Sequence, residues 1–243
     1  MRYFVLVLLL GVAALAEEPK TASPAQRYTL KTVHDYNGIG KFYMDREIAI
    51  VMGHQGASWL ERPEREKEEQ PQKLLKILKI EPGFTVADIG AGSGYYAFRM
   101  AHLVGEKGKI LAVDIQPEMI GMLDSRIKRD KITNVETVQS KDNDPKLKKE
   151  SVDLIIMVDV YHEFSEPFEM TEKLIHALKP GGRLAFVEFR KEDPRVPIKE
   201  VHKMSEKQVL KEMAVFPMMK HDGTNEELPW QHVIFFKKLL PKK

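Results

Sequence analysis

Hydrophobic positions from residue 85 onward follow two alternating patterns, which together predict an α/β fold. Short apolar runs occupy residues 85–89, 109–115, 135–139, 152–158 and 183–188. Runs of this length are typical of strands, and the fourth run is apolar enough to be buried on both faces of a sheet. Apolar positions at helical spacing occupy residues 95–104, 117–129 and 170–178. This order favours a mostly parallel sheet with helices on both faces.

The region before residue 85 is more polar. Residues 45–52 predict a short helix with Asp45 as its N-cap. Residues 59–70 mix acidic and basic side chains, which is typical of a solvated helix with local ion pairs. Pro71 predicts the start of another helix, because proline is tolerated in a first turn. We therefore expect a helical extension ahead of the sheet.

The last part of the chain is less regular. Residues 205–208 form a capping box, which predicts a helix that continues over residues 209–214. Residues 233–236 (VIFF) predict a final strand. Between them, residues 215–231 contain two prolines and a glycine, so we expect a turn or an irregular connection.

The first residues are typical of a secretory signal. Arg2 precedes an apolar run that ends in the cleavage pattern Ala-Leu-Ala at residues 14–16. The run is shorter than the ~20 residues that span a membrane, although an uncleaved N-terminal anchor is the alternative. We expect cleavage after Ala16 and export of the mature protein, periplasmic or secreted. The predicted parts are a signal peptide (1–16), a linker with a helical extension (17–72) and a ligand-binding domain (73–240).

Composition excludes several classes of function. Lys and Arg total 38 against 36 Asp and Glu, a net charge of +2. This balance gives no broad basic field, so we expect no nucleic-acid partner. The chain has no Cys, which excludes disulfides, thiolate metal sites and a Cys nucleophile.

The most informative stretch is residues 86–96, which reads VADIGAGSGYY. A predicted strand carries Asp88 near its end and is followed by three glycines at alternate positions and then a helix. Glycine permits a tight turn and close approach of the backbone to a ligand, and a helix N-terminus offers free N–H groups. Asp114 ends the second predicted strand, about 20 residues after Gly94, where a carboxylate accepts hydrogen bonds from ribose hydroxyls.

Residues 86–96 resemble the first motif of class I S-adenosylmethionine-dependent methyltransferases. Later features that agree lie at residues 113–115, 141–144, 153–159 and 178–182. The resemblance implies a Rossmann-like seven-stranded, mostly parallel sheet with helices on both faces and an antiparallel last strand. It also implies S-adenosyl-L-methionine as the cofactor and methylation of an unidentified acceptor, either a small molecule or a protein. Residues 159–164, taken together with the N-terminal export signal, resemble a bacterial branch of this family whose acceptor is unknown.

The resemblance further implies a set of cofactor-binding residues. The methionine end lies at Asp88 and the glycine turn, and the ribose lies at Asp114. Ile115 packs on the adenine or in the core, and Asp142 meets the adenine amino group or lies beside it. Asp159 follows the fourth strand, where the family places groups that face the substrate. The complete set is Asp88, Gly90, Ala91, Gly92, Gly94, Asp114, Ile115, Asp142 and Asp159.

Methyl transfer depends chiefly on alignment, because the sulfonium of the cofactor already activates the methyl group. A base is required only where the acceptor must lose a proton. His162 titrates nearest neutral pH and is the best candidate, with Tyr161 and Glu163 as alternatives. A role in which His162 only orients its loop is an equal interpretation. We expect no metal, because His162 and His176 share a motif region without the spacing of paired ligands.

Two other functions fit parts of the sequence. Residues 92–97 (GSGYYA) match the pattern G-x-G-x-x-A of dinucleotide-dependent oxidoreductases. A match that begins at Gly92 leaves Asp88 and Gly90 without a role. The other alternative is a non-catalytic protein that binds S-adenosylmethionine. In this superfamily, N-terminal additions often close over the acceptor pocket. The corresponding candidate acceptor contacts are Tyr43, Arg46, His54, Trp59 and Arg62.

Overall fold

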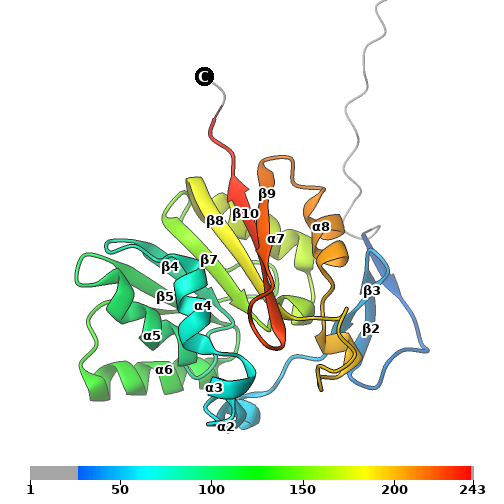
Figure 1. Ribbon diagram of the computed structural model, residues 1–243, viewed down its shortest axis with the longest axis horizontal. Helices are drawn as coiled ribbons and strands as arrows, with labels where there is room; N and C mark the ends of the chain where they lie inside the picture. Colours follow the sequence, from blue (N-terminus) through cyan, green and yellow to red (C-terminus); the bar gives the residue numbers. More distant parts are fainter. Residues whose placement is uncertain (1–26, 242–243) are drawn as a thin grey trace, which may run out of the picture.

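The computed structural model describes residues 27–241, so the predicted signal peptide lies outside the described residues. Its main feature is a seven-stranded sheet in the order β6-β5-β4-β7-β8-β10-β9 (Figure 1). Strands β4 to β8 pair in parallel, whereas β10 is antiparallel to both of its neighbours. The predicted Rossmann-like sheet with an antiparallel last strand is confirmed. The strands are β4 (Thr85–Ile89), β5 (Lys109–Asp114), β6 (Val135–Gln139), β7 (Val152–Val158), β8 (Leu178–Phe189), β9 (Met219–Asn225) and β10 (Gln231–Lys238).

Helices cover both faces of this sheet. Leu74, Phe98 and Leu123 belong to a core on one face, and they come from α4 (Pro71–Leu78), α5 (Tyr95–Val104) and α6 (Pro117–Asp130). Leu174 and Val209 belong to a second core on the other face, and they come from α7 (Pro167–Ala177) and α8 (Glu206–Met213). As predicted, Pro71 begins α4. The predicted cap of α8 is also confirmed, since the Ser205 hydroxyl accepts the N–H of Gln208 at 3.1 Å.

The N-terminal extension is not mainly helical, and the helix predicted over residues 45–52 is wrong. The chain instead forms a small antiparallel sheet of β1 (Tyr28–Leu30), β2 (Gly38–Tyr43) and β3 (Arg46–Ala49). Met44 and Asp45 connect β2 to β3 with φ angles of 46° and 71°. A two-residue turn of this left-handed kind matches the twist of a β-hairpin. Asp45 therefore lies in a hairpin turn and not at a helix N-cap.

The single solvated helix predicted over residues 59–70 is also wrong. The structure has η1 (His54–Gly56), α2 (Ala57–Leu60) and α3 (Arg65–Glu68), and Pro63 lies in the break between α2 and α3. Proline has no N–H to continue a helix. Arg65 and Glu69 are buried and joined by an ion pair of 2.6 Å from Nε to Oε2, so part of this charged segment faces the interior.

The C-terminal region contains a strand where we expected an irregular connection. β9 pairs with β10 at the sheet edge through backbone hydrogen bonds. Its sequence, MKHDGTN, is polar and largely exposed. An edge strand exposed on its outer side has no alternating apolar pattern by which sequence analysis recognises it. Strand β8 also extends beyond the predicted residues 183–188, since it begins at Leu178 and ends at Phe189.

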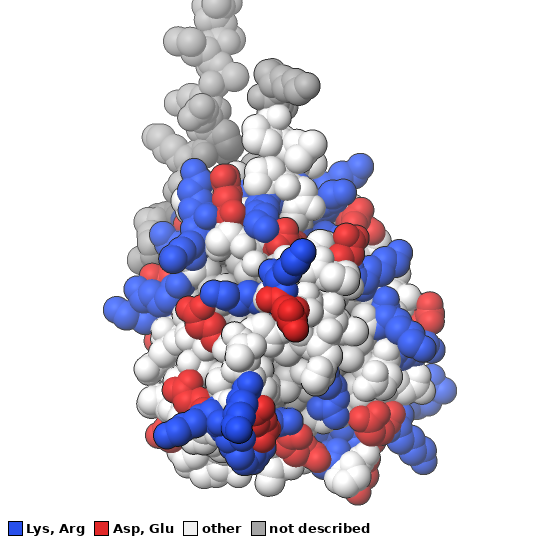
Figure 2. Space-filling view, turned by 90° about the vertical axis from the view of Figure 1, so that its left-hand side faces the viewer, with Lys and Arg blue, Asp and Glu red and all other residues white. Residues whose placement is uncertain are grey.

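Charged side chains of both signs are intermingled on the face of the molecule that bears α5 and α6 (Figure 2). This face presents no single-sign field of the kind that attracts a polyanion, in keeping with the balanced composition. Within residues 27–241, no helix combines the length and the apolar character needed to cross a membrane.

Candidate active site

One cavity of about 580 Å³ lies where three parallel strands end. Strands β5 and β7 flank the central strand β4 on opposite sides, so the direction of chain progression reverses there. Ligands bind at such a switch point, outside the carboxyl ends of the strands. Gly90 follows β4, Asp114 ends β5, and Asp159 follows β7. All three residues line the cavity, so residues far apart in sequence meet at one site.

The glycine turn after β4 leaves room for a ligand that no other residue type would leave. Gly90 and Gly92 have φ angles of 69° and 54°, in the left-handed region. A Cβ atom on Gly90 would lie 2.5 Å from Cγ2 of Val160, and one on Gly92 would lie 2.6 Å from Cδ1 of Leu60. The backbone can therefore form one wall of the cavity only because these positions are glycine.

Asp114 is a buried carboxylate that also orders the turn. Its Oδ2 accepts the N–H of Gly92 and its Oδ1 accepts the N–H of Gln116, both at 2.9 Å. Burial raises its pKa above the ordinary value for an aspartate, although these two hydrogen bonds oppose the shift. Each oxygen retains a lone pair for a further donor.

Asp159 carries an unsatisfied acceptor at the end of β7. Its φ angle is 52°, and its Oδ2 accepts a hydrogen bond of 2.6 Å from Nε2 of Gln231. Within residues 27–241, its Oδ1 is buried without a hydrogen-bond partner. Burial raises its pKa well above the ordinary value. A buried carboxylate oxygen without a partner is costly, so this position is suited to a cationic ligand group.

Several other residues predicted for the cofactor also line the cavity. Ile115 and Asp142 both line it, together with the apolar side chain of Met119. The Asp142 carboxylate accepts the Ser165 hydroxyl at 3.0 Å. These residues can enclose a flat ring such as adenine and offer it one polar contact.

Three of the predicted cofactor residues do not line the cavity, namely Asp88, Ala91 and Gly94. Asp88 is 3% exposed and accepts a hydrogen bond from the backbone of Ala97. Burial raises its pKa to about 7. The side chain of Asp88 is therefore buried and forms no part of the cavity wall. Gly94 is the N-cap of α5, with a φ angle of 84°.

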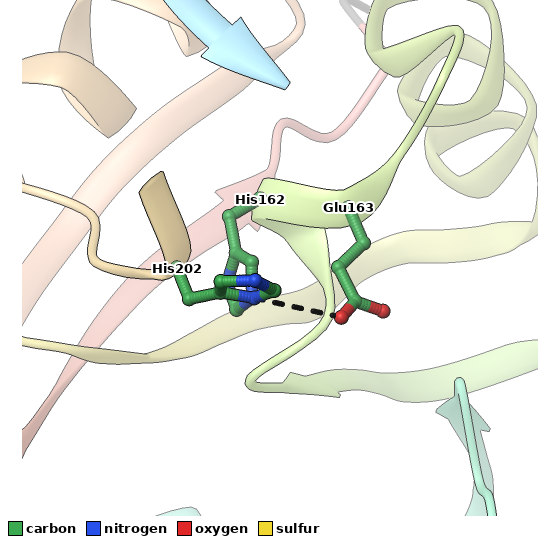
Figure 3. Close-up of side chains that lie close together, drawn as sticks. All are labelled: His162, Glu163 and His202. Carbon is green, nitrogen blue, oxygen red and sulfur yellow. Dashed lines mark hydrogen bonds and ion pairs between the residues drawn. The ribbon is translucent and has the colours of Figure 1, made fainter. Parts of the chain in front are cut away.

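The predicted base, His162, lies on the cavity wall in a group of three titratable side chains. Figure 3 shows His162 and Glu163 side by side in η2 (Tyr161–Glu163), with His202 reaching toward them from η3 (Glu200–His202). His202 Nδ1 lies 3.2 Å from Nε2 of His162 and 3.7 Å from Oε1 of Glu163. The alternative base Tyr161 faces away, into the core, where its hydroxyl donates to Glu212 at 2.7 Å.

The surroundings shift the pKa values of these three side chains in different directions. Burial disfavours the protonated ring of His162, but Glu188 outweighs burial and holds the pKa of His162 above its usual value. Burial and the nearby His162 lower the pKa of His202 to about 4. Burial raises the pKa of Glu163 to about 7. His202 lies 40 residues beyond His162, so no sequence spacing signalled that the two would meet.

The segment after β3 closes over the cavity. The N–H of Met52 donates to Oε1 of Glu163 at 3.1 Å, and the N–H of His54 donates to Oε1 of Gln116 at 2.8 Å. Nε2 of Gln116 donates back to the carbonyl of Met52 at 3.0 Å. Of the predicted acceptor contacts, Trp59 lines the cavity, whereas Tyr43, Arg46, His54 and Arg62 do not.

Comparison with known proteins identifies the family. Residues 80–233 match the family described as "Methyltransferase domain". A solved structure of a SAM dependent methyltransferase from Aquifex aeolicus superimposes with a TM-score of 0.73 and 28% identity, covering 78% of this chain and all of that one. The chain therefore belongs to this methyltransferase family. Its fold is that of the class I S-adenosylmethionine-dependent enzymes.

Curated relatives match over shorter stretches. An arsenite methyltransferase from Halobacterium salinarum is 33% identical over 104 residues, which cover 43% of this chain and 27% of that protein. The ubiquinone/menaquinone biosynthesis C-methyltransferase UbiE of Wigglesworthia glossinidia brevipalpis is 28% identical over 119 residues. This match covers 49% of this chain and 48% of that protein. The chain thus spans about half or less of these relatives.

S-adenosylmethionine, the cofactor of this family, fits the residues present. The glycine turn leaves a backbone cradle, and Asp114 has free lone pairs for hydroxyl groups. The unsatisfied Oδ1 of Asp159 suits the positively charged amino group of the cofactor. The family match does not favour a dinucleotide-dependent oxidoreductase.

Proposed function

We propose that this protein transfers a methyl group from S-adenosylmethionine to a small acceptor bound in the same cavity. The observation that carries the proposal is the meeting of the glycine turn, Asp114 and the unsatisfied carboxylate of Asp159 at one switch point. The cofactor, when bound, supplies an electrophilic methyl group on a sulfonium sulfur.

The chain's own residues bind and align the reactants. Asp114 accepts hydrogen bonds from the ribose hydroxyls while it holds the turn through Gly92. Asp159 binds the amino group of the methionine portion beside Gly90. Ile115 and Asp142 contact the adenine. Alignment of an acceptor against an activated methyl group supplies much of the acceleration, so a fixed cradle is the main requirement.

The acceptor side of the cavity is the wall formed by His162, Glu163 and His202. All three line the cavity. We propose that this wall holds the acceptor and assists the loss of its proton, with His162 as the fixed member because Glu188 restrains its ring at 2.6 Å. Atoms balance in the transfer: the acceptor loses one proton to solvent and forms a bond to the methyl carbon, while the carbon–sulfur bond breaks with its electron pair on sulfur.

One feature supports a small acceptor, and another argues against a thiophilic one. Residues Met52 and His54 are hydrogen-bonded to Glu163 and Gln116, so the segment after β3 narrows the access to the cavity. The chain also has no Cys, so it lacks the soft thiolate ligands that would suit a thiophilic acceptor such as the arsenite named for one relative.

The proposal is tested by transfer of a labelled methyl group. The full chain is incubated with S-adenosylmethionine carrying a trideuterated methyl group and with a small-molecule extract of the source cells. We expect labelled product and demethylated cofactor with the wild type, and loss of both with Asp114→Ala. Binding of the cofactor without labelled product in any fraction would contradict turnover and favour the non-catalytic binding protein.

The location of the protein remains a prediction from residues 1–16. We propose that the chain is exported and that the mature protein begins at Glu17, after the Ala-Leu-Ala pattern. Mass spectrometry of the protein from its native cells tests this directly. An N-terminus at Met1 would contradict cleavage and support the uncleaved anchor.

A further inference from the structure

We propose that His162, Glu163 and His202 bind a divalent transition-metal ion of the Zn²⁺ kind on the acceptor wall of the cavity. The inference deepens the proposed function and rests on it only for what the ion does to the acceptor. Two imidazoles and one carboxylate, with a further position left open, form a common ligand set of catalytic zinc sites.

The donor atoms are spaced as ligands of one ion. His162 Nε2 and His202 Nδ1 lie 3.2 Å apart, and nitrogens bound to one tetrahedral zinc lie about 3.3 Å apart when each Zn–N bond is about 2.0–2.1 Å. Glu163 Oε1 lies 3.7 Å from His202 Nδ1. One ligand atom from each residue falls within 4.8 Å of the other two. An ion would replace the proton that the two imidazoles otherwise share.

Glu188 orients the ring of His162 from the side away from the ion. Oε2 of Glu188 lies 2.6 Å from Nδ1 of His162, so Nδ1 carries a hydrogen, and in the neutral ring Nε2 has the free lone pair that an ion requires. Oε1 of the same carboxylate accepts the N–H of Tyr161 at 3.0 Å, which fixes the carboxylate in place. A carboxylate behind a metal-bound histidine, which sets the tautomer and ring orientation, is the usual support of such a ligand.

The buried carboxylates near His162 carry enough negative charge to neutralise a divalent cation. Glu163 and Glu188 are two buried or nearly buried carboxylates on either side of His162, with side-chain exposures of 11% and 0%. The nearest buried arginine, Arg46, is already paired with Glu212 through two hydrogen bonds of 2.7 and 3.0 Å. Neutral imidazoles and two carboxylates together neutralise one divalent cation.

The site faces the space assigned to the acceptor. All three donors line the cavity with Gly90 and Asp114, and the covering segment reaches it through Met52. A divalent ion there would favour an acceptor with an oxygen nucleophile, because such an ion lowers the pKa of a bound hydroxyl. The proton would leave to solvent, and the oxygen would be held toward the cofactor.

The test is a titration of the untagged full chain with ZnCl₂ by calorimetry, after treatment with a chelator. We expect one ion per chain, an affinity at least 100-fold weaker in His202→Ala, and an affinity about 10–100-fold weaker in Glu188→Gln. His221→Ala is the matched control, because His221 lies outside the cavity and contacts Thr224; its affinity should equal that of the wild type. A Co²⁺ titration gives an independent spectrum, whose visible bands should disappear in His202→Ala.

Absence of stoichiometric Zn²⁺ binding, or equal binding by the wild type and His202→Ala, would overturn the inference. If His202→Ala fails to fold by circular dichroism, Glu163→Gln serves in its place with the same expected loss. Cofactor binding is measured on the same preparation. Binding of S-adenosylmethionine without Zn²⁺ overturns only the metal site, whereas Zn²⁺ binding without S-adenosylmethionine overturns only the proposed function.

Discussion

Asp114 and Gly92 are joined by a hydrogen bond of 2.9 Å from the glycine N–H to the carboxylate Oδ2. The bond connects the end of β5 to the turn after β4, so one carboxylate orders the glycine cradle and also faces the cavity. Two parts of the cavity wall are therefore fixed relative to each other before any ligand arrives. Such preorganisation reduces the ordering cost of binding.

Replacement of Asp114 should weaken cofactor binding strongly. Asp114→Ala is expected to lose about 2 kcal/mol or more of binding free energy for S-adenosylmethionine, because hydrogen bonds to a charged group are worth about 1.5–3 kcal/mol. Calorimetry measures the change. Asp130→Ala, at the exposed end of α6, is the control and should bind as the wild type does. Unchanged affinity in folded Asp114→Ala would remove Asp114 from the site.

The cradle should not tolerate a side chain at Gly90. Gly90→Ala places a Cβ 2.5 Å from Cγ2 of Val160 at a φ angle of 69°, so Val160, which lines the cavity, has to shift. We expect at least a tenfold loss of cofactor affinity. Gly121→Ala is the matched control: apart from its chain neighbours and the adjacent helix backbone, no described atom lies within 4 Å of its Cβ, and α6 should gain about 0.5–1 kcal/mol of stability. Equal affinities in the two variants would contradict the cradle.

Asp88 should make the stability of the ligand-free protein depend on pH. Its folded pKa is about 7 because of burial, against about 3.9 in an unfolded chain. The folded state therefore binds more protons between these values, and the carboxyl destabilises the protein increasingly as pH rises through that window. The unfolding free energy of Asp88→Asn minus that of the wild type should rise from pH 4 to about 7 and then level off. Denaturant titrations at several pH values measure it, and a flat difference would contradict the assignment.

The N-terminal sheet should depend on one buried ion pair. Arg46 in β3 binds Glu212 in α8 through Nε and Nη2 at 2.7 and 3.0 Å. Arg46→Met should cost about 3–5 kcal/mol of stability, because it leaves the Glu212 charge buried without its partner. Adding Glu212→Gln should recover part of the loss, since glutamine is neutral and still accepts from Tyr161. A double variant no more stable than Arg46→Met would contradict this account.

Sequence patterns predicted the sheet well because its strands are buried. The bounds of β4, β6 and β7 agree with the predicted runs, since continuous apolar segments between turns leave few alternatives. The hairpin at Met44 and Asp45 was missed because neither residue signals a left-handed turn as Asn-Gly does. β9 was missed because its side chains are polar and largely exposed, so they form no alternating apolar pattern.

Sequence analysis pointed to many of the residues that line the cavity, among them Gly90, Asp114 and His162, but not to His202. The glycine turn and Asp114 belong to consecutive elements, so their spacing carries the signal. His202 and Gln231 reach the site or its supports only through tertiary folding. Asp88 was expected to contact the ligand, but the pleat turns its side chain into the interior beneath the turn.

The most direct test of the central claim is calorimetric titration of the full chain with S-adenosylmethionine, with S-adenosylhomocysteine and, separately, with NAD. The site described here should bind the first two in a one-to-one ratio, with Asp114→Ala weakened for both, and should not bind NAD. Binding of NAD by the folded chain, or failure to bind either S-adenosyl compound, would contradict the assignment of this cavity to methyl transfer.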